Sequence, residues 1–512
     1  MKKLVLIRVD SSASIGTGHL SRCLTLADAL RPCDVDVLFL CRFISDAFAK
    51  RIASNGHRLE VLTNPPQPET DDTPAAHAAW LGTSRASDAE ETIEKIKALD
   101  QKPDWLVVDH YALDEQWEKR LRPFVQNIFV IDDLADRAHD CDLLLDQNLH
   151  QGLEQRYRGL LSPACTTLLG PKYALLRPEF RRDSDDLRDV RRQPRSIMVF
   201  MGGVDLGNES LRVVKNFIAL DRTDISLSVI VGNDNPHYAD MRAQFSSFPN
   251  ISFHVNVSNM AERLDAADVA FGAGGVAMWE RCCVGVPTIT VSVAENQESG
   301  AQAVGAYGGT LYLGRSADVS DDTIRGALTL ILNSESLRSS LSSHAASLVD
   351  GAGCARVIKH LISSGLHLRP ANEDDSDAIF EWRNDEDVRR FSGDGKVLKF
   401  EDHQRWFANT LVNADRILLI GEDDGKPVGV LRYDLDQDVA KISIYLVPGN
   451  SGRGIGLSLL VAGEKWLTNA YPAIRYFHAE VCNDNIASMR LFETMNFTPH
   501  LTVFQKEVKA HV

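Results

Sequence analysis

A glycine-bearing loop near the N-terminus carries the first residues that could do chemistry. Gly16, Gly18 and His19 follow the apolar run Leu4–Val9 and precede the helical pattern Leu20–Leu30. Glycines at a strand-to-helix turn let the backbone approach a ligand closely, and a helix N-terminus favours an anion. A histidine at this point can act as a general acid or base, or it can simply cap or pack the helix.

Polar residues that follow two predicted buried strands could orient His19. They are Asp10, Asp109 and Tyr111. The carboxyl ends of parallel strands meet at one edge of a sheet, so these side chains are expected near each other. Each of them could instead bond to loop backbone.

Two further glycine clusters indicate ligand contacts made by the backbone. Gly272–Gly275 follows the predicted strand Val269–Phe271 and precedes a helical stretch with Glu280. Gly452–Gly456 follows the predicted strand Ala440–Val447 in the same manner. Successive amides ahead of a helix can hold a diphosphate, although a glycine turn without any ligand has the same pattern.

The elements that must position these loops divide the chain into three parts. Short apolar strands alternate with helices in residues 1–180 and again in 196–362, which predicts two parallel sheets covered by helices. The charged segment 181–195 is predicted to be a linker. Residues 366–512 have the size of one compact domain, with a hairpin turn at Glu422–Lys426. The expected fold class is α/β, with two Rossmann-like halves followed by a mixed α/β domain.

Composition excludes several classes of function. The 512 residues are 44% hydrophobic and 25% charged, as in soluble globular proteins. The net charge of −16 disfavours nonspecific binding to nucleic acid or a membrane surface. The chain enters a strand at once and has no apolar run long enough to span a bilayer, so we expect a cytoplasmic protein. The nine cysteines contain no C-x-x-C pair, and we expect no metal and no disulfide framework.

The loop around His19 resembles a specific family. Its run R-x-D-x-S-x-x-I-G-x-G-H-x-x-R-C-L resembles the UDP-2,4-diacetamido-2,4,6-trideoxy-β-L-altropyranose hydrolases of pseudaminic acid biosynthesis. Further matches follow in order: Val108–Asp114, Val130–Asp133, Leu169–Phe180, Met201–Asp205, Gly272–Glu280 and Glu295–Gln297. The resemblance spans roughly residues 1–360 and implies a GT-B-like pair of halves that binds UDP.

The resemblance also implies how the site works. His19 would be the base that takes a proton from water attacking the anomeric carbon, with Asp10, Asp109 and Tyr111 beside it. UDP is a good leaving group, so neither a strong acid nor a metal is required. Glu280 would accept hydrogen bonds from the ribose. The expected substrate-binding residues are Gly16, Gly18, Arg22, Tyr173, Gly202, Gly203, Asp205, Gly274, Gly275, Glu280, Asn296 and Gln297.

The third glycine loop and the segment Asn483–Phe497 resemble the GNAT N-acetyltransferases. Ser451 stands where that family's coenzyme A loop usually has Gln or Arg, and Phe492 stands where many members have a tyrosine as general acid. The acid is therefore unassigned, and strand amides near Leu446 and Val447 would meet the oxyanion. The expected acetyl-CoA-binding residues are Leu446, Val447, Gly452, Arg453, Gly454, Gly456, Leu457, Asn485 and Ser488.

Together the two resemblances predict a bifunctional enzyme. It would hydrolyse the UDP-diacetamido sugar to UDP and free sugar, and would acetylate an amine, the UDP-4-amino sugar precursor, with acetyl-CoA. One alternative is a UDP-sugar glycosyltransferase fused to an acetyltransferase of proteins or other amines. Another is a nucleotide-sugar-binding or regulatory protein with degenerate sites, and a fourth is a protein acetyltransferase tethered to a hydrolase.

Overall fold

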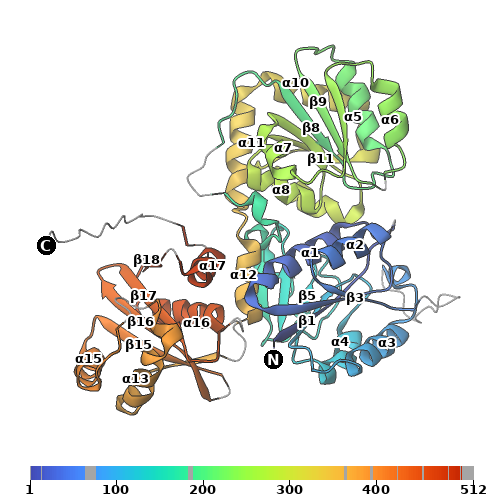
Figure 1. The fold of residues 1–512 in the computed structure, drawn as a ribbon. Helices are drawn as coiled ribbons and strands as arrows, with labels where there is room; N and C mark the ends of the chain where they lie inside the picture. Colours follow the sequence, from blue (N-terminus) through green and yellow to red (C-terminus); the bar gives the residue numbers. More distant parts are fainter. Residues whose placement is uncertain are drawn as a thin grey trace. The chain divides into compact units, whose positions relative to one another are not determined.

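Three β-sheets organise the chain in the computed structural model (Figure 1). The structure describes residues 2–12, 14–63, 77–182, 188–233, 235–362, 366–391, 396–423, 425–451, 455–482, 484–495 and 497–498. Lys3–Ala29 and Asp36–Val357 form one compact unit, which contains two of the sheets. Ile358–Val512 forms a second unit together with two short N-terminal segments.

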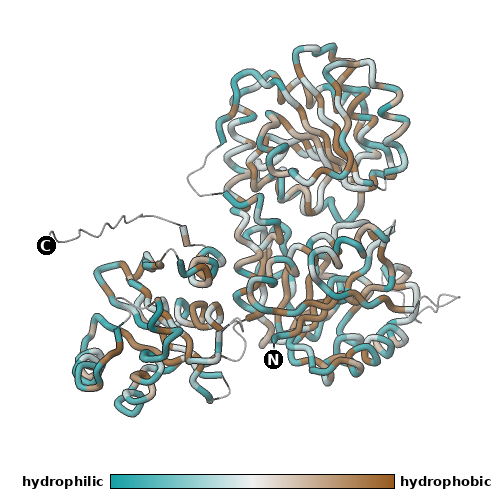
Figure 2. The backbone as a smooth tube through the Cα atoms, in the orientation of Figure 1, coloured by the Kyte–Doolittle hydropathy of each residue, from teal (hydrophilic) through white to brown (hydrophobic). Residues whose placement is uncertain are grey.

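The first sheet has seven strands in the order β3-β2-β1-β4-β5-β6-β7. The strands are β1 (Lys3–Val9), β2 (Val35–Cys41), β3 (Arg58–Val61), β4 (Trp105–Asp109), β5 (Asn127–Ile131), β6 (Leu143–Asp146) and β7 (Thr166–Leu169). The helices are α1 (Gly18–Leu30), α2 (Asp46–Ser54), α3 (Arg85–Lys97) and α4 (Glu115–Leu121). Figure 1 shows α1 and α2 on one side of this sheet and α3 and α4 on the other. Covering on both faces explains why the central strands are continuous apolar runs, which Figure 2 shows in brown.

The second sheet repeats this arrangement with six parallel strands in the order β10-β9-β8-β11-β12-β13. The strands are β8 (Ser196–Phe200), β9 (Ser226–Val231), β10 (Ile251–Val255), β11 (Val269–Ala273), β12 (Thr288–Ser292) and β13 (Leu311–Arg315). The helices are α5 (Glu209–Ile218), α6 (Tyr238–Phe245), α7 (Met260–Ala266), α8 (Val276–Val284), α9 (Glu298–Tyr307), α10 (Asp321–Asn333) and α11 (Glu335–Leu348). In both sheets the strand order reverses beside the first strand, and ligands of such sheets bind at that point.

After α11 the chain returns to the first half through α12 (Gly353–Ile362). A Cβ atom at Gly353 would lie 2.1 Å from the carbonyl oxygen of Ala174, so only glycine permits this approach. Arg356 Nη1 donates to the carbonyl of Lys172 at 2.6 Å, and Cys354 Sγ donates to that of Leu176 at 3.4 Å. The start of α12 therefore ties the chain that follows the second sheet to the first half.

The third sheet is mixed and runs in chain order from β14 to β18. Its strands are β14 (Leu366–Pro370), β15 (Arg416–Asp423), β16 (Lys426–Asp436), β17 (Val439–Leu446) and β18 (Tyr476–Ala479). The first three pairings are antiparallel and β17 pairs with β18 in parallel. The helices are α13 (Ser376–Asn384), α14 (Glu386–Arg389), α15 (Phe400–Val412), α16 (Ile455–Ala470) and α17 (Ile486–Thr494). Ile379 of α13 and Phe407 of α15 share one apolar cluster with Val430 of β16.

The predicted fold class is confirmed: two Rossmann-like sheets precede a mixed sheet. In the described part of the chain, every helix is too short or too polar to cross a bilayer.

Candidate functional site

A cavity of about 900 Å³ opens at the carboxyl ends of the two parallel sheets, with walls from both. The walls include the loop before α1, the end of β8, and the loop between β11 and α8. Predicted site residues that line it are Gly16, Gly18, His19, Arg22, Tyr111, Gly202, Gly203, Asp205, Gly274, Gly275, Glu280, Asn296 and Gln297. The structure thus brings together residues that are as much as 281 positions apart (16 to 297).

His19 lies in the first turn of α1, is 7% exposed and reaches Asp109 at the end of β4. Its Nδ1 is 2.5 Å from Asp109 Oδ1. The carboxylate can only accept, so Nδ1 carries the proton and Nε2 is left as the proton acceptor of the ring. Arg22 Nη2 is also 3.2 Å from Nδ1, but its 2.7 Å contact with Asp109 directs it to the carboxylate.

Arg22 and His19 together hold Asp109 in its ionised form. Arg22 donates through Nε to Oδ2 and through Nη2 to Oδ1, both at 2.7 Å. Burial raises the pKa of Asp109, but the charges and hydrogen bonds of Arg22 and His19 outweigh it and hold the pKa well below its ordinary value. The resulting negative charge favours the imidazolium form of His19 during a reaction.

Tyr111 forms a wall against His19 and does not act as an acid. Its ring packs edge-on to the imidazole, with centroids 4.5 Å apart, and its hydroxyl donates to Asp133 Oδ1. Trp80 stacks against the ring of Tyr111, with centroids 5.6 Å apart. Burial and Asp133 raise the pKa of Tyr111 well above its ordinary value, and the side chain of Asn296 bonds to the hydroxyl from the second half. The hydroxyl therefore stays protonated and bound.

Trp80, Asp133 and Asn148 were not among the predicted site residues. Asp133 was part of the sequence match at Val130–Asp133, which was the only signal that could have found it. Asn148 joins the two halves, because its Nδ2 donates to Asp133 Oδ2 and its Oδ1 accepts from Trp279 Nε1, both at 3.1 Å. Trp279 is fully buried in α8. This bridge ties the helix beside the glycine loop to the group around His19.

Asp10 was predicted to orient His19 and does not. One carboxylate oxygen accepts from the backbone amides of Arg42 at 2.6 Å and Phe43 at 3.1 Å. The guanidinium of Arg8 lies 2.8 Å from it, and His110 Nε2 lies 3.3 Å from the other oxygen. Asp10 is completely buried and anchors the loop after β2, which is the loop-backbone role left open by its position after a strand.

The second half lines the cavity with glycine backbone, whereas the first half lines it with charged side chains. Gly275 has φ +86° and Gly202 has φ +99°, both in the left-handed region that favours glycine. The nine-residue helix α8 starts at Val276, directly after the loop, and its first amides are unpaired within the helix. A helix N-terminus reached through such a loop can hold a diphosphate.

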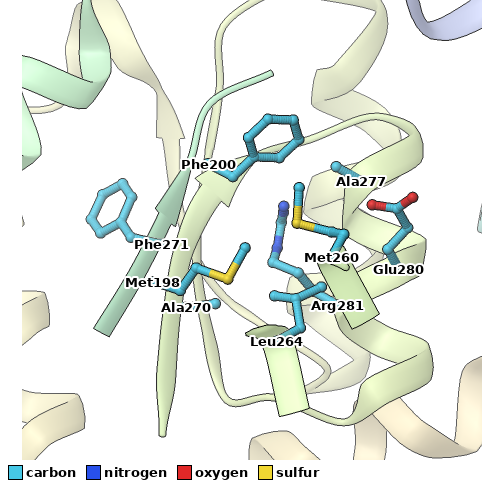
Figure 3. Close-up of a pocket in the computed structure, with 9 residues that line it drawn as sticks. All are labelled: Met198, Phe200, Met260, Leu264, Ala270, Phe271, Ala277, Glu280 and Arg281. Atoms are coloured by element: carbon cyan, nitrogen blue, oxygen red, sulfur yellow. The ribbon is translucent and has the colours of Figure 1, made fainter. Parts of the chain in front are cut away.

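Glu280 and Arg281 leave α8 in different directions (Figure 3). Glu280 lines the cavity, and its Oε1 accepts from Arg177 Nη2 at 3.4 Å. Burial raises the pKa of Glu280 and Arg177 lowers it in part. Arg281 is buried beneath the glycine loop and donates to the carbonyl of Ala273 at 2.6 Å, and burial lowers its pKa to about 10.

Three other predicted residues have more limited roles than expected. Asp205 lines the cavity, but its carboxylate accepts the amides of Glu209 and Ser210 at 2.9 Å each and so caps α5. Gln297 Oε1 accepts the amide of Val293 at 3.1 Å. Tyr173 is not among the residues that line the cavity, and the ammonium of the neighbouring Lys172 lies over its ring at 5.1 Å. The expectation that Tyr173 reaches the cleft is therefore corrected.

In the third sheet the predicted coenzyme A residues are only partly described. Gly452, Arg453 and Gly454 lie outside the described residues, while Gly456 and the buried Leu457 belong to the first turn of α16. Asn485 accepts the amide of Ser488 at 3.0 Å and caps α17.

The oxyanion role expected for Val447 is wrong, because its amide donates to the carbonyl of Val428 at 3.0 Å. Leu446, which was expected to share that role, lies opposite Gly429 across the sheet, and its role stays a prediction. Phe492, which stands where many relatives have an acid, packs edge-on against Phe497 with centroids 5.0 Å apart.

Comparison with known families assigns the third sheet. Residues 365–498 match the family model of the acetyltransferase (GNAT) domain. The C-terminal unit contains a GNAT domain. Its mixed sheet agrees with that match.

Relatives and solved structures cover the rest of the chain. An uncharacterised protein of Methanocaldococcus jannaschii is 23% identical over 518 residues, with 96% of both chains covered. The UDP-2,4-diacetamido-2,4,6-trideoxy-β-L-altropyranose hydrolase of Campylobacter jejuni is 25% identical over 297 residues, or 58% of this chain and 93% of the relative. MurG of Acinetobacter baumannii matches 70% of this chain and 99% of its own with a TM-score of 0.50 at 13% identity, which shows a shared GT-B-like fold. The expected resemblance to the hydrolase, joined to a GNAT domain, is confirmed.

Proposed function

We propose that the GT-B-like unit hydrolyses a UDP-linked sugar, and that its substrate is UDP-2,4-diacetamido-2,4,6-trideoxy-β-L-altropyranose. The observation that carries the proposal is the His19–Asp109 pair, 2.5 Å apart, because His19 lines the same cavity as the glycine loop before α8. Similarity to the Campylobacter jejuni hydrolase over 93% of that enzyme's length supports the choice of substrate.

The reaction follows from the two sides of the cavity. Water attacks the anomeric carbon while His19 Nε2 takes its proton, the C1–O bond breaks, and UDP leaves with the bonding electrons. Asp109 stabilises the imidazolium that forms, and a positioned base of this kind contributes roughly 10²–10⁴-fold to the rate. The amides at the start of α8 receive the charge that develops on the diphosphate, and the nearby positive charge of Arg281 adds to this stabilisation.

We further propose that Glu280 holds the ribose of UDP. Its carboxylate lines the cavity from the second turn of α8, and its one hydrogen-bond partner among the described residues is Arg177, at 3.4 Å. A carboxylate in this state can accept two hydroxyl donors. The GNAT domain would transfer the acetyl group of acetyl-CoA to the amine of a UDP-4-amino sugar, so that one chain performs both acetylation and the later hydrolysis.

The direct test measures UDP release by the full chain from a panel of UDP-sugars without any acceptor. The proposal predicts that the diacetamido sugar is turned over and that UDP-GlcNAc is a poor substrate. Release that depends on adding an acceptor sugar would identify a glycosyltransferase instead. Incubation with acetyl-CoA and the UDP-4-amino sugar, followed by mass spectrometry, tests the second activity in the same preparation.

A further inference from the structure

Arg383 is a half-buried cation that lacks an anionic partner among the residues that the structure describes. It lies near the end of α13, and its guanidinium carbon is 5.2 Å from the ring centroid of Trp406 in α15. Within the described residues it makes neither an ion pair nor a hydrogen bond. Burial and the nearby Arg432 both lower its pKa, and the only group that raises it is Tyr445.

The groups around Arg383 are also incompletely satisfied. The hydroxyl of Tyr445 in β17 is buried and has no hydrogen-bond partner in the described structure. Burial raises the pKa of Tyr445, while Arg383 and Arg432 lower it, so both cations face this hydroxyl. His403 donates from Nε2 to the carbonyl of Ser376 at 2.9 Å, and its buried Nδ1 is left without a partner. We call Arg383, Trp406, Arg432 and Tyr445 the Arg383 cluster.

Other arginines of the same sheet show what a satisfied side chain looks like here. Arg369 pairs with Asp375 at 2.7 Å and Glu422 at 2.7 Å, and Arg416 pairs with Asp434 at 2.6 Å. A cation withdrawn from water without a counter-ion costs free energy, and such groups persist where they have a ligand to bind. Among the described residues Arg383 departs from the pattern of its neighbours, as expected of a cation that binds an external anion.

The position of the Arg383 cluster in the sheet indicates which kind of ligand supplies the missing anion. Tyr445 is opposite Val430 on the sheet face that α13 and α15 cover, and these two helices lie side by side in Figure 1. It is the residue before Leu446, where β17 ends and the chain enters the glycine loop before α16. The cluster is thus at the end of β17 but on the opposite face from α16, which packs beneath Tyr433.

We propose that the Arg383 cluster binds a phosphate of the acceptor, so that the GNAT domain acetylates an amine whose molecule also carries a phosphate or diphosphate. The inference rests on the proposed function and deepens it, because a nucleotide-linked amino sugar has this chemistry. The forked donors of a guanidinium match phosphate oxygens, and the Tyr445 hydroxyl supplies one more donor. Arg432 is paired with Asp434 at 2.9 Å, so the charge of Arg383 is the one that would repel a polycationic acceptor or a lysine-rich peptide.

The chemical step itself does not involve Arg383. The amine nitrogen attacks the thioester carbonyl carbon, the carbon–sulfur bond breaks, and the amine proton is transferred to the departing thiolate. Arg383 is a binding residue that selects which amine is presented. Its loss should therefore act on the KM of a phosphate-bearing acceptor and leave the turnover number of other acceptors unchanged.

The test compares initial rates of acetyl transfer by the full chain to the UDP-4-amino sugar and to the same amino sugar without UDP. We expect the UDP-linked form to have the higher kcat/KM. Arg383→Gln should lower kcat/KM for the UDP-linked form roughly 10–100-fold, mainly by raising KM, since the hydrogen-bonded charge pair between Arg383 and the phosphate is lost. The free sugar should be unaffected, and Arg383→Lys should keep part of the preference. The matched control is Arg405→Gln, whose side chain is 78% exposed on α15 and pairs with Asp402.

Equal loss for both acceptors in Arg383→Gln would show a structural role and overturn the proposal. A wild-type preference for the free sugar would overturn it as well. Competition provides a measurement that needs no variant: UDP should inhibit acetyl transfer competitively against the UDP-linked acceptor, and absence of competition would contradict the cluster as a phosphate site. If neither sugar is acetylated, the proposed acetyltransferase function fails together with this inference. If both are acetylated at rates that do not depend on Arg383, only this inference fails.

Discussion

The two parallel-sheet halves share one strand order and end in opposite kinds of chemistry. Beside β1 and β4 the first half places His19, Arg22 and Asp109, which are charged or titratable and almost fully buried. Beside β8 and β11 the second half places glycines whose backbone lines the cavity. The shared fold supplies the crevice in both halves. The residues that follow each strand determine whether a half performs chemistry or holds a ligand.

The two halves also fix their site residues by different means. In the first half each buried charge has a counter-charge, so Asp109 holds both Arg22 and His19 in place. In the second half the loop is fixed by backbone conformation, with Arg281 donating to Ala273 beneath it. Variants of the first half should therefore lower kcat, and variants of the second should raise KM.

The largest effect is expected for His19→Ala. Loss of the base should reduce hydrolysis of the UDP-sugar by roughly 10²–10⁴-fold, while UDP affinity measured by calorimetry stays unchanged. His344→Gln, an exposed histidine on α11, is the matched control and should keep full activity. Hydrolysis near the wild-type rate in the His19 variant would contradict the claim that the first half performs the chemistry and the second half binds UDP.

Asp109→Asn should have the next largest effect. Replacing the carboxylate removes a charged hydrogen bond to His19, and we expect kcat to fall roughly 10–100-fold. Since the pKa of Asp109 is held well below its ordinary value, its own titration should not be visible near neutral pH in the wild type. A kcat near the wild-type value in this variant would contradict the pairing.

Glu280→Gln tests the role of the second half in binding UDP. If the carboxylate holds the ribose, KM should rise about tenfold with little change in kcat, because a hydrogen bond to a charged group is weakened. Glu335→Gln on α11, 53% exposed, provides the control. A fall in kcat without a change in KM would place Glu280 in the chemical step.

The smallest effect is expected at the bridge between the halves. Asn148→Ala and Trp279→Phe each remove the 3.1 Å hydrogen bond between these residues, and each should lower kcat/KM roughly 2–10-fold. The double variant should lose less than the product of the two single losses, since both remove one interaction. Fully independent losses would show that the bridge does not couple the halves.

The sequence predicted strands where a short apolar run ends in a polar residue. We expected a strand at Trp105–Asp109, and β4 has these bounds in the structure. The strands β3 and β13 were not predicted, since they are partly exposed and their patterns are mixed. His19 and Asp109 could be paired in advance, because neighbouring strands bring their ends together.

Side-chain direction is what the sequence could not provide. Asp10 and Asp109 both follow buried strands, yet only Asp109 turns to His19 while Asp10 bonds to the loop at Arg42. Asn148 gave no signal because its two partners, Asp133 and Trp279, are 15 and 131 positions away. The amide of Val447 could not be assigned from the sequence, because it depends on the register of the hairpin that brings Val428 beside it.

The central claim is that water, activated by His19, attacks the anomeric carbon. Hydrolysis of the UDP-diacetamido sugar in water enriched in ¹⁸O, followed by mass spectrometry of both products, tests it most directly. The account predicts that the label appears in the free sugar and that UDP carries none. Label in UDP would place the attack on phosphorus and contradict the account.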